Sequence, residues 1–194
     1  MSRALRAQLA DATVAAASAV GYANVGSVEF LLDGDGTFYF IKMHTRVQVE
    51  HAVPETLTGV DLVQAGIRIA AGEPLSLDEK DVAVRGHAIE CRVHGDCTAG
   101  VRHTVRAFHA PGGLGIRVES ALEAGHVVTG EETPLLATVL AHGATRALAL
   151  ARLRAALPEL VIDGVPTDLA LHRRVIDDPA FVRGGVRTTW LDTP

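Results

Sequence analysis

The stretch 37–50 reads TFYFIKMHTRVQVE, and polar and apolar residues alternate with period two from Lys42 to Glu50. Successive side chains of a strand point to opposite faces, so the alternation predicts a strand with one apolar face. The other face would carry a row of polar side chains: Lys42, His44, Arg46, Gln48 and Glu50. Two cations, an imidazole, an amide and a carboxylate rarely gather on one strand face. We interpret the row as a site, with a solvated edge strand as the alternative.

A four-residue turn signal, Asp33-Gly34-Asp35-Gly36, joins this strand to an apolar stretch over residues 25–32. Such a signal between two strand patterns predicts a β-hairpin. With a four-residue loop, Glu29 lies opposite Phe40 and diagonal to Lys42. Diagonal neighbours are within reach of long side chains, so an ion pair between Glu29 and Lys42 is expected. The alternative is that Lys42 points into solvent.

The rest of the chain mixes helical and strand patterns, which predicts an α+β fold. Helices are expected over residues 4–20, 144–157 and 167–177, and from a capping box at Thr58-Gly-Val-Asp61 to Gly72. Further strands are expected over residues 82–93 and 116–120. Residues 1–194 are expected to form a single domain, with a sub-boundary near residues 73–81, where proline and acidic residues cluster.

Composition narrows the functional classes. The net charge of −5, with no basic cluster, argues against a nucleic-acid partner. The sequence has no run of 18 apolar residues and no hydrophobic signal core, so no membrane association is expected and a cytoplasmic location is predicted. The two cysteines are interpreted as reduced thiols.

Several segments resemble the carboxyl-terminal part of the ATP-grasp biotin carboxylases. They are YFIKMHTRVQVEH (39–51), TGVDLVQAGIRIAAG (58–72), VRGHAIECRV (84–93), FHAPGGLGIRVES (108–120) and LVIDGVPTDLALHRRVIDDPAF (160–181). The resemblance extends from about Asp11 to Leu191. It implies an antiparallel sheet with flanking helices, like the carboxyl-terminal part of a biotin carboxylase without the ATP-grasp amino-terminal half.

The resemblance also implies roles for residues of the polar row. In the family, the residues that match Arg46, Gln48, the backbone of Val49, and Glu50 hold bicarbonate and supply the base. The residue that matches Arg117 steadies the biotin enolate. All are present here, so one pocket containing Glu50, Arg46 and Arg117 is expected, with Gln48 and His44 on its wall. A structural pairing of Arg46 with Glu50 is the alternative.

Other positions depart from the family. The residues that match Glu29 and Lys42 are both glutamates there and hold the magnesium of ATP, whereas a lysine ammonium would repel that cation. His44 stands where the family has asparagine, and the chain is expected to lack the phosphate-binding half that precedes this part in the family. The isolated chain is therefore expected to need no cofactor and to use neither ATP nor magnesium.

Two smaller clusters are interpreted structurally. Cys91, His94, Cys97 and His103 have zinc-compatible side chains, but Cys91 matches a family strand that binds no metal. Its alternation suggests a core thiol, so no metal site is predicted. The cluster Gly112–Gly115 is expected to be a turn that delivers Arg117, rather than a phosphate site.

Three functions follow. The main hypothesis is a repurposed biosynthetic enzyme, independent of ATP and metal, that binds a carbonyl or carboxylate small molecule. It would act by acid–base chemistry through an enolate, as a lyase or cyclase: cyclisation, dehydration, aldol-type closure or decarboxylation. Lys42, His44, Gln48, Val49 and Glu29 would bind the substrate, in a homodimer or with a partner subunit. The alternatives are one subunit of a split biotin carboxylase acting on bicarbonate and biotin, and a non-catalytic remnant that regulates a carboxylase.

Overall fold

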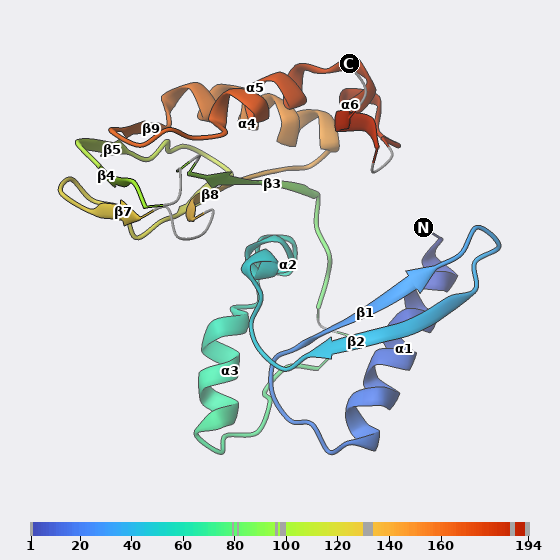
Figure 1. Cartoon of the computed structure of the whole chain (residues 1–194). Coiled ribbons are helices and arrows are strands. Elements are labelled where there is room, and N and C mark those ends of the chain that lie inside the picture. Colours follow the sequence, from blue (N-terminus) through green and yellow to red (C-terminus); the bar gives the residue numbers. More distant parts are fainter. Residues whose placement is uncertain are drawn as a thin grey trace. The chain divides into compact units, whose positions relative to one another are not determined.

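The computed structural model describes residues 2–78, 80, 82–95, 97, 100–129, 134–186 and 189–192. The chain divides into two compact units, Met1–Ala83 and Val84–Pro194 (Figure 1). Whether the two units act as the single domain expected from the sequence stays a prediction. Among the described residues, no helix is both long and apolar enough to span a lipid bilayer.

The described part of the first unit consists of helices and one β-hairpin. Its elements are α1 (Arg3–Ala19), β1 (Ser27–Leu32), β2 (Phe38–His44), the 3-10 helix η1 (Val49–His51), α2 (Ala52–Thr58) and α3 (Leu62–Ala70). The Ser2 hydroxyl caps α1 by accepting from the Leu5 amide at 3.2 Å, and Gly21, at φ +63°, follows its end. The helix predicted over residues 4–20 is confirmed.

The β1–β2 hairpin is present, but its register differs from the predicted one. Leu32 pairs with Phe38, and an irregularity between Glu29 and Phe30 sets Glu29 directly opposite Lys42. The loop spans residues 33–37, one residue more than predicted, and the Asp33 amide donates to the Thr37 carbonyl across it at 2.8 Å. Glu29 and Lys42 are therefore direct cross-strand neighbours rather than diagonal ones.

The strand expected to continue to Val49 ends at His44 instead. The last pair of the hairpin joins Ser27 to His44. Just before Ser27, a Cβ at Gly26 would lie 2.8 Å from the His44 carbonyl oxygen. Because β1 begins at Ser27, the residues after His44 have no residue of β1 to pair with. The chain leaves the sheet there and continues into η1. The prediction of five polar side chains on one strand face is therefore wrong.

The helix expected from Thr58 to Gly72 is present as α3 but begins later than predicted, and α2, which precedes it, was not predicted. Thr58 ends α2, Gly59 follows with φ +75°, and Asp61 is the N-cap of α3 rather than its third residue. The Asp61 carboxylate accepts from the Gln64 amide at 2.7 Å. The glycine adopts the left-handed conformation that terminates helices, and the aspartate satisfies an amide at the start of the next.

Among its described residues, the second unit contains three small antiparallel sheets. One sheet orders β3 (His87–His94), β8 (Leu135–Gly143) and β6 (Ile116–Glu119), with β8 in the middle. The two-stranded sheets pair β4 (Arg102–Thr104) with β7 (Val127–Thr129), and β5 (Ala107–His109) with β9 (Val161–Asp163). Its helices are α4 (Arg146–Glu159), α5 (Leu169–Asp177) and α6 (Pro179–Arg183), followed by the 3-10 helix η3 (Trp190–Asp192).

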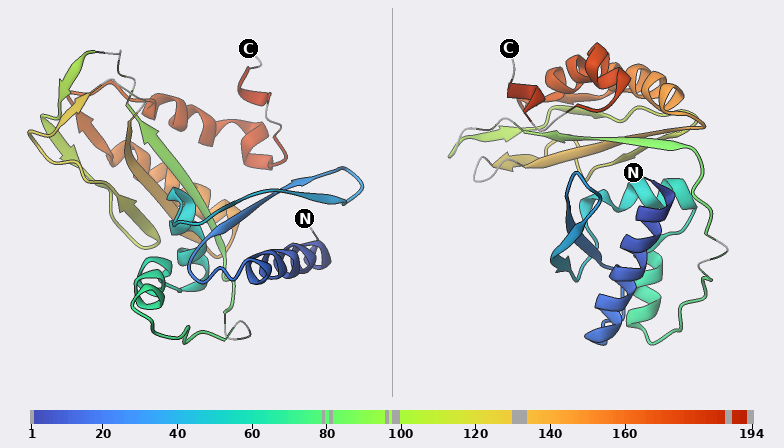
Figure 2. Two further views of the ribbon diagram at one scale, coloured as in Figure 1. Left: turned by 60° about the horizontal axis from the view of Figure 1, so that its bottom comes forward. Right: turned by 90° about the vertical axis from the view of Figure 1, so that its right-hand side faces the viewer.

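The core of this unit lies between the three-stranded sheet and helices α4 and α5, which cover one face of the sheet (Figure 2). Its buried side chains include Val93 of β3, Val139 of β8, and Leu150, Leu153 and Leu157 of α4. Burial of each such side chain contributes about 1.5–3 kcal/mol. The predicted α+β fold, an antiparallel sheet with flanking helices, is confirmed.

Candidate functional site

Three residues of the predicted site line one pocket in the first unit. Arg46, Gln48 and Glu50 border a cavity of about 330 Å³. Its other lining residues are Val25, Gly26, Ser27, Val47, His51, Pro54 and Leu62. The three side chains therefore reach a common space even though they do not share a strand face.

The turn after β2, not strand alternation, gathers these side chains. Gln48 is extended, at φ −98° and ψ 162°, and precedes η1. The His51 amide donates to the Gln48 carbonyl at 3.1 Å, and the ring Nδ1 of His51 lies 2.9 Å from the same oxygen. Arg46 donates to the Val47 carbonyl at 3.2 Å. Val49, predicted to contribute its backbone, lies within η1 and is not among the lining residues.

His51, Pro54 and Leu62 line the same pocket without having been predicted to do so. Pro54 lies in the first turn of α2, where a proline costs no helical hydrogen bond. That proline was the available signal for a helix beginning just after His51. No comparable sequence signal marked Leu62 as a pocket residue. It lines the pocket because α2 ends at Thr58 and α3 begins at Leu62.

Glu29, Lys42 and His44 form a separate cluster on the hairpin. The Glu29 carboxylate lies 2.6 Å, through Oε1, from Nε2 of His44, and 3.6 Å, through Oε2, from Nζ of Lys42. The hydrogen bond with His44, and then the charge of Lys42, hold the pKa of Glu29 below its ordinary value. The expected ion pair is present. None of the three residues lines the Arg46 pocket, so the prediction that His44 lies on its wall is wrong.

This cluster does not suit a magnesium ion. Magnesium takes oxygen ligands in a near-octahedral arrangement, whereas the trio offers one carboxylate, and both its oxygens face nitrogen atoms of Lys42 and His44. No group of three or more His, Cys, Asp or Glu side chains within the described residues could hold a metal ion. We therefore assign no chemical step to a metal held by Glu29.

Arg117 lies in the second unit, on β6. Its guanidinium donates to the Glu119 carboxylate, with Nε at 3.0 Å from Oε1. The glycine cluster before it forms a turn, as predicted, and the Gly115 carbonyl accepts from the His142 amide at 2.8 Å. Glu50 belongs to the first unit, so a single pocket containing both Glu50 and Arg117 stays a prediction.

The four zinc-compatible residues differ in their surroundings. Cys91 is part of the apolar core, and burial raises the pKa of its thiol to about 12. The backbone amide of His94 donates to the Asp168 carboxylate at 2.9 Å, and its ring Nδ1 lies 3.5 Å from the same group. Asp168 thereby ties the end of β3 to the start of α5, a contact that the sequence did not indicate.

Comparisons with known proteins extend over both units. Residues 94–193 match the family model of the biotin carboxylase C-terminal domain, and residues 1–78 match that of the carbamoyl-phosphate synthase L chain ATP-binding domain. A biotin carboxylase of Pseudomonas aeruginosa is 47% identical over 89% of this chain and 39% of its own length. A pyruvate carboxylase subunit of Methanothermobacter thermautotrophicus is 38% identical over 99% of this chain and 40% of its own length. The chain thus spans well under half of these relatives.

Comparison with solved structures also identifies biotin carboxylases as similar to this chain. The biotin carboxylase domain dimer of Hydrogenobacter thermophilus 2-oxoglutarate carboxylase, in complex with MgADP, ADP and bicarbonate, has a TM-score of 0.92 and 37% identity. The match covers 99% of this chain and 43% of that one. A Campylobacter jejuni biotin carboxylase in complex with β,γ-ATP has a TM-score of 0.90 and 30% identity, covering 99% and 44%. The resemblance stated from the sequence is confirmed.

These comparisons overturn the main functional hypothesis. The relatives named above are carboxylases, and the two solved neighbours are complexes with MgADP and bicarbonate or with β,γ-ATP. The ATP- and metal-independent lyase or cyclase is therefore wrong, and so is the expectation that no cofactor is involved. That hypothesis gave too much weight to Lys42 and His44, which change the surroundings of one carboxylate. The carboxylase alternative is better supported.

Proposed function

Since the chain belongs to the family of biotin carboxylase C-terminal domains, we propose that it serves as the carboxyl-terminal part of an ATP-dependent biotin carboxylase. The observation that carries this proposal is the pocket shared by Arg46, Gln48 and Glu50. A guanidinium, an amide and a carboxylate around one cavity form a suitable binding site for a small oxyanion that must also lose a proton.

Bicarbonate fits this set of side chains. The Arg46 guanidinium can donate charge-assisted hydrogen bonds to two of its oxygens, and the Gln48 amide can donate another. Glu50 accepts the proton of the bicarbonate hydroxyl, which leaves a more nucleophilic carbonate. The ring of His51 contacts the Gln48 carbonyl and so stabilises the turn that carries Gln48 and Glu50.

In this proposal, ATP is bound by the segment 1–78, which matches the ATP-binding domain model, together with the part of the relatives' length that this chain does not match. Arg117 serves the second half of the reaction, in which its guanidinium stabilises the enolate oxygen of biotin as carboxylation proceeds. Glu119, which Arg117 contacts, orients that guanidinium. The small-molecule substrates are therefore bicarbonate and biotin, and a cytoplasmic location is part of the same proposal.

The hairpin supports association with another polypeptide or a second copy. Leu31, Tyr39, Phe40 and Ile41 are each more than half exposed. They alternate between the two faces of a sheet that has two strands among the described residues. An isolated two-stranded hairpin is marginally stable in water, and exposed apolar clusters often mark protein contacts. We propose that this hairpin, which lies within the segment 1–78, packs against the rest of the ATP-binding domain in the assembled enzyme.

A reconstitution assay tests the proposal. The chain is mixed with the amino-terminal part of the Pseudomonas aeruginosa relative, and ATP-dependent transfer of labelled bicarbonate to free biotin is measured. Activity is expected in the mixture and in neither part alone. Glu50→Gln should reduce the rate about a hundredfold or more, because it removes the base and keeps the shape. Glu73→Gln, an exposed change outside the pocket, is the matched control. Full activity in Glu50→Gln would contradict the assigned base.

A further inference from the structure

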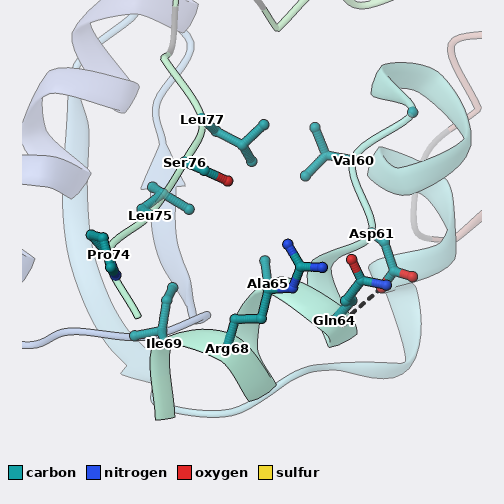
Figure 3. A pocket seen from close by; sticks show the side chains of 11 residues that line it. Val60, Asp61, Gln64, Ala65, Arg68, Ile69, Pro74, Leu75, Ser76 and Leu77 are labelled. Atoms are coloured by element: carbon teal, nitrogen blue, oxygen red, sulfur yellow. Dashed lines mark hydrogen bonds between the residues drawn. The ribbon is translucent and has the colours of Figure 1, made fainter. Parts of the chain in front are cut away.

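A second pocket lies in the first unit and shares no lining residue with the Arg46 pocket. Its volume is about 240 Å³, and it opens between helix α3 and the segment 74–77 (Figure 3). It is lined by Gly59, Val60, Asp61, Gln64, Ala65, Arg68, Ile69, Pro74, Leu75, Ser76 and Leu77. The proposed carboxylase chemistry uses none of these side chains.

The end of α3 creates this pocket. Gly72, at φ +87°, reverses the chain after the helix, a conformation that suits glycine. The Glu73 amide then donates to the Arg68 carbonyl at 3.0 Å, which fixes where the returning chain starts. Residues 74–77 run back past the helix without joining a sheet. The space between them and α3 therefore follows from the backbone path.

The walls of the pocket are largely apolar. Val60 and Leu77 lie on opposite sides, and Leu75 and Ile69 continue the apolar surface (Figure 3). Leu75 is 59% exposed and Leu77 is 40% exposed. Apolar side chains that face a hollow but stay accessible to solvent are typical of ligand sites. The walls would therefore bind an aliphatic group.

One cation projects into this apolar space. The Arg68 guanidinium points from α3 toward the gap between Val60 and the segment 74–77 (Figure 3). Within the described residues, the Arg68 side chain makes neither a hydrogen bond nor an ion pair. The nearby Asp61 carboxylate is already used as the N-cap that accepts from the Gln64 amide. The five N–H donors of Arg68 are thus available to an oxygen ligand.

We propose that this pocket binds a small monocarboxylate with a short aliphatic chain. The carboxylate would accept two parallel hydrogen bonds from Arg68, the geometry for which a guanidinium is preorganised. The aliphatic chain would lie against Val60, Leu75 and Leu77. The volume falls below the roughly 300–1,000 Å³ of pockets for drug-sized ligands, so the ligand is smaller than a nucleotide. This inference goes beyond the proposed carboxylase function and does not depend on it.

The test is a titration of the full ¹⁵N-labelled chain with sodium hexanoate, followed by the amide resonances. Saturable shifts are expected at Val60, Gln64, Ala65 and Leu75. Hexanol, which keeps the chain but lacks the charge, should bind about tenfold or more weakly, because a hydrogen bond to a charged group is lost. A hexapeptide ending in leucine has the same carboxylate and distinguishes a peptide terminus from a free acid. Weaker binding by the peptide is expected, and tighter binding would overturn the assignment to a free acid.

Variants locate the site. Arg68→Met keeps the aliphatic stem and should weaken hexanoate binding about tenfold or more. Arg174→Met, which changes an exposed arginine on α5 in the other unit, should leave it unchanged. If Arg68→Met disturbs the spectrum of the free chain, Arg68→Lys replaces it, and a smaller loss is expected because the charge remains. Absence of saturable shifts, shifts confined to other residues, or unchanged affinity in the Arg68 variant would each overturn the proposal.

Discussion

Nε2 of His44 lies 2.6 Å from Oε1 of Glu29, across the β1–β2 hairpin. The other carboxylate oxygen of Glu29 lies 3.6 Å from the Lys42 ammonium. One carboxylate therefore contacts two nitrogen-bearing side chains of the opposite strand. This arrangement distinguishes the hairpin from the pair of glutamates that the resemblance places at the positions of Glu29 and Lys42.

The first prediction concerns the pKa of Glu29. The His44 hydrogen bond is the largest cause of its lowering, and the Lys42 charge is a smaller one. His44→Ala should therefore raise the pKa of Glu29 more than Lys42→Met does. Carboxyl ¹³C titration measures both shifts. A larger effect of the lysine change would contradict the assigned order.

The same lowering has a consequence for stability at acid pH. Because the folded pKa is depressed, the contribution of Glu29 to stability is present above its ordinary value of 4.5 and is lost as the pH falls through the folded value. Glu29→Gln should flatten the acid side of the stability curve below pH 4.5. Urea unfolding at a series of pH values measures this, and an unchanged acid slope would oppose it.

The second prediction concerns Glu55, a buried carboxylate on α2. Its Oε1 accepts from the Leu62 amide at 2.7 Å and the Val63 amide at 3.4 Å, so it supports the start of α3 from the preceding helix. Glu55→Ala should cost about 1–2 kcal/mol, as losses of helix caps do. Hydrogen exchange at Leu62 and Val63 should accelerate. Glu73→Ala, an exposed change in the same unit, should leave both amides protected.

The third prediction compares two glycines of the turn before β6. Gly115 has φ +76°, and a Cβ there would lie 2.7 Å from the His142 carbonyl oxygen and would also meet the Arg152 guanidinium. Gly115→Ala should therefore lower the free energy of unfolding by about 1–3 kcal/mol. Gly112→Ala is the control, because a Cβ there meets no atom within 4 Å. Denaturation followed by Trp190 fluorescence measures both, and equal costs would refute the steric argument.

The fourth prediction concerns the two thiols. Cys91 is 6% exposed and its pKa is raised to about 12, whereas Cys97 is only half-buried. Since the thiolate is the reactive form, iodoacetamide should modify Cys97 first and Cys91 only after unfolding. Peptide mass spectrometry identifies the modified residue.

The raised pKa of the Cys91 thiol also makes the free energy of unfolding depend on pH in the alkaline range. Its folded pKa is raised from 9.0 to about 12, so the folded state keeps a proton that the unfolded state loses. The stabilising contribution is complete below pH 9.0 and is lost as the pH rises toward 12. Cys91→Ala should remove that decline. A decline of the same size in the variant would assign it to other groups.

The sequence by itself determined the local elements and the family. The hairpin and helices α1, α4 and α5 lie where periodicity and turn residues predict them, because each depends on residues close together in the chain. The family followed from motifs spread over nearly the whole length. The functional hypothesis was wrong because it inferred a loss of ATP-dependent chemistry from two substituted side chains, Lys42 and His44. The motifs over the rest of the chain indicated a carboxylase.

Only the tertiary structure decided where β2 stops, where α2 gives way to α3, and how the candidate site forms. Alternation continues past His44 in the sequence, but a strand needs a partner, and β1 begins at Ser27, which pairs with His44. The chain therefore leaves the sheet and folds into a 3-10 turn. That turn, rather than a strand face, brings Arg46, Gln48 and Glu50 to one pocket. Periodicity is a local property, whereas the hydrogen-bond partner that ends a strand comes from a distant part of the chain.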